Sequence, residues 1–476
     1  MEVNTLKRKI AKGFLSLTFR KALLLGINYL TINIILARIL PVSTIGIFNI
    51  ASSVLAFFTF FSDIGLAAAL IQKKEIKPED IKTTFTIQEI LAFIIMVIVW
   101  FGAPSFASFY ALDQMGMWLI RSLALSFFLV SLKVIPSVLL ERDLKFQPLV
   151  AVEVLETIVF NLILILLTLA NFSVAAFSWA VLARGTTGVL AIYLLAPWRV
   201  GFGFSSSSIK TLLNFGLPFQ ANSILALLKD RLVPLVIAKM VGSVGIGYIT
   251  WSQSLAFLPL EAMNIMIRVT FPAFSRLQGN SEKLGQILED SLFVTSLVLY
   301  PMLFGLFAVA PSLILHVVSA KWQPALPLIY LFGTGAFFAT LSSPFTNFLN
   351  ATGKINITLR LMVMWTALEW GLSPILTIYF GFLGVGIASA IISVTSIIPI
   401  FIIKKIVDIR IIKNIWKPIF ASLTMAIFAF FLSNIFVYNF LSLSLVILIS
   451  ATFYFALIFS LARQRIMHYI TSLKND

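Results

Sequence analysis

Long apolar stretches recur along the whole chain, and their length constrains the fold more than any other feature. A helix needs about 20 apolar residues to cross the hydrocarbon core of a bilayer. We therefore expect an all-α integral membrane protein of about fourteen transmembrane helices. A count of twelve or thirteen stays open, because the first stretch contains Arg20 and Lys21, and only Asn171-Phe172 separates the fifth from the sixth. The fourteen predicted spans are residues 14–40, 45–71, 83–107, 115–140, 149–170, 173–195, 211–238, 245–272, 289–312, 323–350, 356–379, 382–403, 415–437 and 440–462.

The composition supports a membrane protein and excludes several other classes. Of the 476 residues, 60% are hydrophobic and only 11% are charged, whereas soluble proteins have about 25% charged residues. Cysteine is absent, which excludes disulfides and thiolate sites, and His316 and His468 lie far apart, so we expect no metal site. The net charge of +16 is explained mostly by loop orientation and anionic lipid, so we expect no nucleic-acid partner.

The positive charges are distributed unevenly between the two sides of the predicted membrane. With the N-terminus inside the cell, the cytoplasmic segments hold 24 of the 35 Lys and Arg residues, and the outer loops hold almost none. This asymmetry predicts an even number of spans, with both termini cytoplasmic, in the cytoplasmic membrane. The cytoplasmic segments are residues 1–13, 72–82, 141–148, 196–210, 273–288, 351–360, 404–417 and 463–476.

Short sequence matches indicate an internal repeat. Ala37-Arg38 and Ile45-Gly46 recur 201 residues later as Ala238-Lys239 and Ile246-Gly247, at the junction of the first two helices of a six-helix block. Equal helix numbers give parallel copies with the substrate expected between them, although a chance match is the alternative. We predict a six-helix N-terminal lobe at 1–200, a six-helix C-terminal lobe at 201–405, and two further transmembrane helices with a cytoplasmic tail at 406–476.

Charged residues occur inside several predicted spans, where one charge costs roughly 2.5 kcal/mol or more. Residues near helix ends, namely Arg20, Lys21, Arg121, Glu153 and Glu156, are expected to reach the headgroups. The deeper residues are Arg184, Lys229, Asp230, Arg231, Glu261, Arg268 and Glu369.

The deeper charges concentrate between residues 212 and 277. Ser254, Glu261 and Arg268 are spaced by seven, so they share one face of a helix. In a membrane helix such residues face a protein interior or a water-filled cavity. We therefore expect the helix pair 211–238 and 245–272 to line a central polar cavity. Buried ion pairs that lock the helices together are the alternative.

Motifs of the common membrane enzymes and pumps are absent. The sequence has no Gly-x-x-x-x-Gly-Lys-[Ser/Thr] motif and no His-Glu-x-x-His motif, which excludes a nucleotide-driven pump and a zinc protease of those types. No outer loop is long enough to hold a sugar-transferring site. We therefore predict that the protein is not an enzyme.

Several motifs together resemble one family of membrane proteins. They are Leu36-Ala37-Arg38-Ile39-Leu40-Pro41, Phe61-Ser62-Asp63-Ile64-Gly65-Leu66, Leu140-Glu141-Arg142-Asp143-Leu144-Lys145-Phe146, Phe215-Gly216-Leu217-Pro218, Phe271-Pro272-Ala273-Phe274-Ser275-Arg276-Leu277, and Lys321-Trp322 followed by Ala325-Leu326-Pro327-Leu328. Over about residues 10–405 the chain resembles the oligosaccharide flippases, the polysaccharide-transporter branch of the multidrug/oligosaccharidyl-lipid/polysaccharide exporter superfamily.

The resemblance implies two six-helix lobes, often with two added helices, that flip polyprenyl-pyrophosphate-linked oligosaccharides for surface polysaccharide export, such as that of lipopolysaccharide. Alternating access would carry the glycan through a cationic cavity, because a pyrophosphate needs buried Arg or Lys to cross a low-dielectric layer. The candidate contacts are Lys133, Arg184, Lys229, Arg231 and Arg268, and the candidate counter-charges or ion-coupling carboxylates are Asp63, Asp230, Glu261 and Glu369.

Other functions and partners stay open at this point. A flippase for the lipid-linked peptidoglycan precursor and a multidrug exporter of the same superfamily are alternative transporters, and a membrane-embedded glycan polymerase or ligase is a less favoured one. Cationic drugs would favour an acidic cavity, whereas this chain places more bases than acids in its spans. No cofactor is expected. Coupling to H⁺ or Na⁺ and a glycan polymerase as a partner, besides membrane lipids, stay open.

Overall fold

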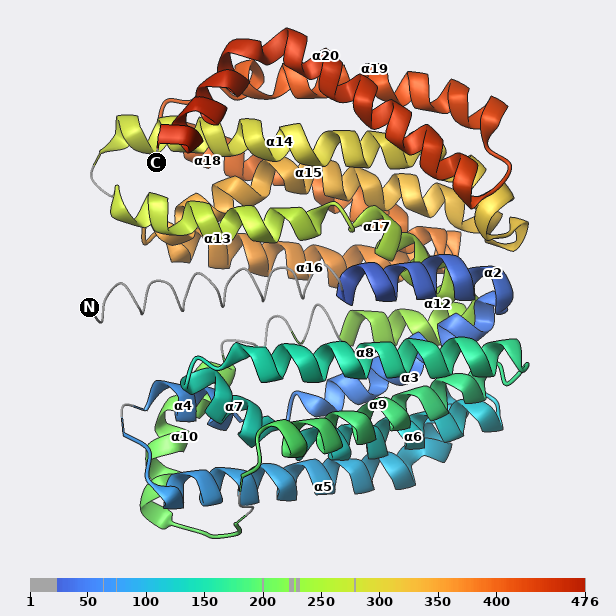
Figure 1. Cartoon of the computed structure of the whole chain (residues 1–476), viewed down its shortest axis with the longest axis vertical. Coiled ribbons are helices and arrows are strands. Elements are labelled where there is room, and N and C mark those ends of the chain that lie inside the picture. The colour runs from blue at the N-terminus through green and yellow to red at the C-terminus, as the bar shows by residue number, and fades with distance from the viewer. Residues whose placement is uncertain are drawn as a thin grey trace. The chain divides into compact units, whose positions relative to one another are not determined.

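The computed structural model describes residues 24–62, 64–73, 75–198, 201–221, 227, 232–277 and 280–475 (Figure 1). These residues form helices and no strand, which confirms the all-α prediction. Twelve helical segments within them are long and apolar enough to cross a membrane, so the chain is a multi-pass membrane protein. They are Val42–Thr59, Pro78–Phe109, Gln114–Arg142, Phe146–Leu169, Val174–Leu195, Val233–Ala256, Ser281–Val318, Ala320–Ala351, Ile355–Phe380, Leu383–Lys404, Ile411–Phe436 and Phe440–Met467.

The predicted count of fourteen is not reached among the described residues. The first predicted span is described only as the shorter apolar helix Leu24–Ile39. The seventh, 211–238, falls partly outside the described residues. The eighth, 245–272, is not one continuous helix, because residues 257–259 form a turn.

The chain divides into two compact units, residues 1–247 and 248–476, and the predicted lobe boundaries at 200 and 405 stay predictions. In the first unit, α5, α6, α8 and α9 pack together around a core that includes Val99, Leu119, Leu164 and Phe177. Its described elements are η1 (Thr31–Leu36), α2 (Ala37–Ile39), α3 (Val42–Thr59), α4 (Leu66–Gln72), α5 (Pro78–Phe109), α6 (Gln114–Ser131), α7 (Val134–Arg142), α8 (Phe146–Leu169), α9 (Val174–Leu195), α10 (Ser206–Ala221) and most of α12 (Val233–Ala256).

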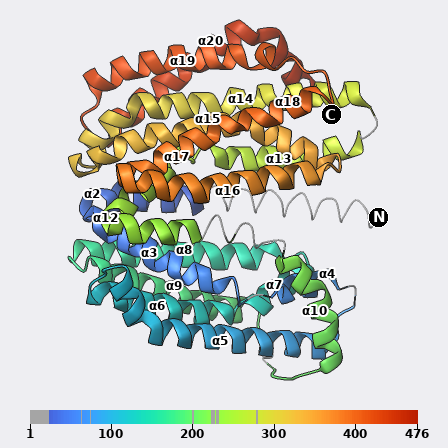
Figure 2. The same cartoon turned by 180° about the vertical axis from the view of Figure 1, so that it is seen from behind.

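In the second unit, α14 packs against α15 and α19, and α16 and α17 lie beside α15 (Figure 2). The last helix is tied to α14 by Arg465 of α20, whose Nη2 lies 2.8 Å from Asp290 Oδ1 and whose guanidinium lies over the ring of Phe293. The elements are α13 (Leu260–Arg276), α14 (Ser281–Ser312), η3 (Leu313–Val318), η4 (Ala320–Ala325), α15 (Leu326–Ala351), α16 (Ile355–Phe380), α17 (Leu383–Val394), η5 (Thr395–Ile397), α18 (Ile398–Lys404), α19 (Ile411–Phe436) and α20 (Phe440–Asn475).

A glycine separates the two helices that were predicted to line the cavity. Within α12, Gly242 has φ 69° and ψ −175°, a conformation that favours glycine because other residues clash through their β-carbon. The helix is therefore interrupted at Gly242. This position lies between the predicted helices 211–238 and 245–272.

The two junctions that carry the sequence repeat contact each other inside the first unit. A β-carbon on Gly46 of α3 would overlap the backbone oxygen of Ser243, and one on Gly247 would overlap the backbone oxygen of Val42. Position 243 lies 201 residues after position 42, and position 247 lies 201 residues after position 46, which is the spacing of the predicted repeat. Each glycine therefore contacts the counterpart of the other glycine's partner. Small residues let membrane helices approach to backbone contact. Positions that are equivalent in the predicted repeat therefore make reciprocal contacts.

The close approach predicts that Gly46 tolerates no side chain. In the Gly46→Ala variant, overpacking should lower the free energy of unfolding by about 1–3 kcal/mol. The matched control is Gly371→Ala on α16, where nothing lies within 4 Å of the added carbon, and alanine there should be neutral or stabilising. Thermal unfolding in lipid nanodiscs, followed by tryptophan fluorescence, compares the two variants. Equal midpoints would contradict the close contact.

Candidate functional site

The structure describes five of the nine candidate residues. Lys133 and Arg184 belong to the first unit, and Glu261, Arg268 and Glu369 belong to the second. The other four, Asp63, Lys229, Asp230 and Arg231, lie outside the described residues.

Lys133 forms an ion pair inside the first unit. It occupies the turn between α6 and α7, and its Nζ contacts Oε1 of Glu156 on α8. The Glu156 side chain is only 3% exposed, so the expectation that this acid reaches the headgroups is wrong. Gly188 of α9 lies against the Glu156 carboxylate, where a β-carbon would overlap it. The pair thus joins the α6–α7 turn to α8 beside α9.

The buried polar face of α8 continues beyond this ion pair. Asn161, 4% exposed, donates from Nδ2 to Asn28 Oδ1 at 2.8 Å and to the backbone oxygen of Thr157 at 2.8 Å. Asn28 belongs to the apolar helix Leu24–Ile39. The amides therefore join two membrane helices, as hydroxyls and amides commonly do in lipid.

Arg184 and Arg121 contact aromatic rings in the first unit. Arg184 of α9 is exposed, and its guanidinium carbon lies 5.8 Å from the centroid of the Phe160 ring. Arg121 of α6 lies 4.9 Å from the Trp118 ring and donates from Nε to the backbone oxygen of Trp100. Cation–π contacts stabilise such guanidinium groups. Arg184 does not join the Lys133–Glu156 pair.

A polar stripe follows α13 in the second unit. Glu261, Asn264 and Arg268 lie at spacings of three and four, with Glu261 half-buried and Arg268 exposed. Asn264 Nδ2 lies 3.5 Å from Glu261 Oε2. Glu261 and Arg268 therefore lie on one face of α13, as predicted. Ser254 is separated from them, because α12 ends at Ala256 and α13 begins only after the turn at 257–259.

A cavity of about 470 Å³ adjoins α13 within the second unit. Its polar lining comes from Thr270 of α13 and from Asp290, Ser291 and Thr295 of α14. Beside it, Asn347 of α15 donates to Thr270 Oγ1 at 2.7 Å. The cavity walls are otherwise apolar, and α13 thus presents both the polar stripe and one wall of the cavity.

Glu369 lies apart from this stripe. It is half-buried on α16, and Ser373 one turn later donates to its Oε1 at 2.7 Å. The residue therefore takes part in a local hydroxyl–carboxylate pair on one helix.

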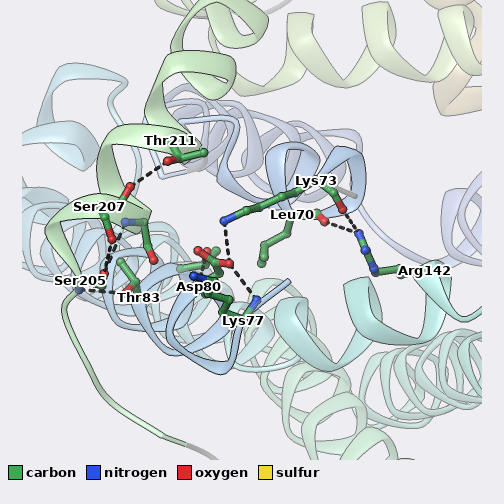
Figure 3. Close-up of polar contacts among 11 residues, drawn as sticks. Leu70, Lys73, Lys77, Asp80, Thr83, Arg142, Ser205, Ser207 and Thr211 are labelled. Atoms are coloured by element: carbon green, nitrogen blue, oxygen red, sulfur yellow. Dashed lines mark hydrogen bonds and ion pairs between the residues drawn. The ribbon is translucent and has the colours of Figure 1, made fainter. Parts of the chain in front are cut away.

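Polar residues at the end of α4 have a different role, shown in Figure 3. Asp80 of α5 is buried, lies 2.7 Å from Lys73 Nζ and accepts a 2.9 Å hydrogen bond from the backbone N–H of Lys77. Arg142, from one of the family-like motifs, donates to the backbone oxygens of Leu70 and Lys73. Basic side chains satisfy the free carbonyls at helix ends in this way. This motif therefore fixes the α4–α5 connection.

A family profile described as polysaccharide biosynthesis protein matches residues 35–327. That stretch is more than half of the chain. The chain belongs to this polysaccharide biosynthesis family. The predicted resemblance to polysaccharide transporters is thereby confirmed at the level of the family.

Curated relatives are similar to the chain along most of their length. It is 24% identical over 378 residues to the lipopolysaccharide biosynthesis protein WzxC of Escherichia coli (strain K12), covering 76% of this chain and 74% of WzxC. It is 23% identical over 380 residues to the teichuronic acid biosynthesis protein TuaB of Bacillus subtilis (strain 168), covering 77% of each chain.

Solved structures of membrane transporters share the fold of the chain. The lipid II flippase MurJ in an inward closed conformation superposes with a TM-score of 0.73 at 14% identity, covering 96% of this chain and 100% of MurJ. An inward-facing multidrug resistance MATE family transporter of the MOP superfamily gives a TM-score of 0.62 at 16% identity, covering 80% and 95%. At these identities the likeness concerns the fold alone.

The buried Lys133–Glu156 pair predicts a large loss of stability when one partner is removed. Lys133→Met leaves the carboxylate without its partner and should lower the free energy of unfolding by about 3–5 kcal/mol. The matched control is Lys145→Met, which breaks the exposed 2.9 Å pair with Asp143 and should cost about 1 kcal/mol at most. Denaturant titration in mixed micelles measures both. Similar losses would show that burial adds nothing to the first pair.

Proposed function

We propose that this polysaccharide biosynthesis protein is a flippase that moves polyprenyl-pyrophosphate-linked oligosaccharides across the cytoplasmic membrane without covalent chemistry. Its family, together with relatives named for lipopolysaccharide and teichuronic acid biosynthesis, supports a surface glycan as the cargo. The fold shared with a lipid II flippase and a MATE transporter supports alternating access. The uneven loop charges support cytoplasmic termini.

The polar stripe on α13 carries the proposal. This helix connects the membrane-length segments that contain α12 and α14, yet it exposes Asn264 and Arg268. An arginine facing hydrocarbon costs roughly 2.5 kcal/mol or more, so an amphipathic helix at this place favours a hydrated space. A guanidinium there is suited to a pyrophosphate, which accepts paired N–H bonds.

We assign the candidates to different tasks on this basis. Arg268 would contact the anionic headgroup or the glycan, with Lys229, Arg231 and Arg184 as further candidates, and Glu261 would balance its charge. Lys133 is engaged by Glu156, so its binding role would require that this pair opens. Asp63, Asp230 and Glu369 remain candidate counter-charges or ion-coupling groups.

The test is flipping of a polyprenyl-pyrophosphate-linked oligosaccharide by the purified protein in proteoliposomes. Because hydrogen bonds to charged groups contribute about 1.5–3 kcal/mol, Arg268→Gln should slow flipping by about tenfold or more. Arg276→Gln, an exposed arginine at the end of the same helix, is the matched control and should keep the wild-type rate.

One outcome tests the role of Arg268, and two outcomes decide between the candidate functions. Equal rates for Arg268→Gln and wild type would remove Arg268 from the site. Flipping of the lipid-linked peptidoglycan precursor instead of the oligosaccharide would favour that alternative. Export of a cationic drug without either lipid would favour a multidrug transporter.

A further inference from the structure

A buried carboxyl group in the first unit lies outside the contacts described so far. Glu89 is on α5, eleven residues after Pro78 and so about 16 Å along the helix from its start. The residue is 7% exposed. It faces Ser131, the last residue of α6, which packs alongside α5.

This carboxyl group has very few partners. Its Oε2 lies 2.8 Å from Ser131 Oγ. Its Oε1 is buried and has no hydrogen-bond partner among the described residues. A buried ionised carboxylate is normally paired with a cation or accepts several hydrogen bonds. Glu89 has no such environment in the part of the chain that the structure describes.

The titratable groups around Glu89 are engaged elsewhere or exposed. On α9, the hydroxyl of Tyr193 donates to the backbone oxygen of Leu132. Other described groups lie on α5 and the segments that pack against it. Lys133 pairs with Glu156, Lys73 with Asp80, Arg142 with the end of α4 and Arg121 with Trp100. The exposed groups include Glu79, Lys82, Asp113, Glu141 and Lys210.

The hydrogen bonds of Ser131 indicate the protonation state of the Glu89 carboxyl group. Ser131 Oγ lies 2.7 Å from the backbone oxygen of Phe128, in the last turn of α6, and 2.8 Å from Glu89 Oε2. A serine hydroxyl has one proton to donate, and a carbonyl oxygen can only accept. If Glu89 were ionised, two acceptors would share that single proton.

A protonated Glu89 resolves this conflict. Glu89 O–H then donates to Ser131 Oγ, and Ser131 O–H donates to the backbone oxygen of Phe128, so that each short contact has its own proton. We infer that Glu89 is a proton-binding site and that it holds its proton in the conformation described. Na⁺ would need several oxygen ligands, whereas among the described residues the carboxyl group has one hydrogen-bond partner, the Ser131 hydroxyl.

The site is placed where a movement of helices would disturb it. Ser131 precedes Lys133 by two residues, so the α6–α7 junction contacts α5 through Glu89 and α8 through Glu156. Separation of α5 from this junction would admit water to the carboxyl group and release its proton. The coupling of that release to transport rests on the proposed flippase function, whereas the bound proton does not.

Infrared difference spectroscopy of the full-length protein in nanodiscs tests the bound proton without any substrate. The wild type at neutral pH should show the carbonyl band of a protonated carboxylic acid, shifted on transfer to D₂O. Glu89→Gln should abolish this band. The matched control is Glu79→Gln, an exposed residue at the start of the same helix, and it should keep the band.

Ser131→Ala provides a second variant that retains the carboxyl group. It should shift the frequency of the band, because the acid loses its acceptor. A band that persists in Glu89→Gln, or a wild type without one, would overturn the inference. If the infrared band depends on Glu89 but the protein does not flip the lipid-linked oligosaccharide, the bound proton stands. Only the proposed flippase function is then contradicted.

Discussion

The hydrocarbon layer offers no hydrogen-bond partner, and this constraint governs the whole structure. A buried polar group is therefore stabilised when it finds a partner within the protein. Lys133 is matched by Glu156, the amides of Asn161 and Asn28 meet, and the last carbonyls of α4 are met by Arg142. Glu89 meets the same demand in another way, by carrying a proton rather than a counter-charge.

Close backbone contact complements these polar contacts in the first unit. Gly46 and Gly247 let the start of α3 meet the backbone of the helix that follows Gly242. In lipid, such packing replaces the hydrophobic effect as the force between helices. The contact joins positions that are equivalent in the predicted repeat. It gives the matched glycines a physical reason, because the backbones meet there and leave no room for a β-carbon.

The sequence predicted those parts of the candidate site in which the residues lie on one helix. Glu261 and Arg268 do share a face of α13, because a seven-residue spacing within one helix fixes that relation. Ser254 does not join them, since a turn that ends at Pro259 interrupts the helix. The Lys133–Glu156 pair joins residues 23 apart, on elements whose packing no spacing rule gives. Glu156 was therefore misplaced at the membrane surface.

The sequence by itself determined the membrane class, the helical architecture and the family, because apolar length and short motifs are properties of contiguous residues. It also located a break between two long helices, which Gly242 provides. Only the tertiary structure decided which charges are paired, which motif residues hold helix ends, and that Glu89 faces the Ser131 hydroxyl. The physical reason is that the cost of a buried charge depends on the atoms around it, and distant segments supply those atoms.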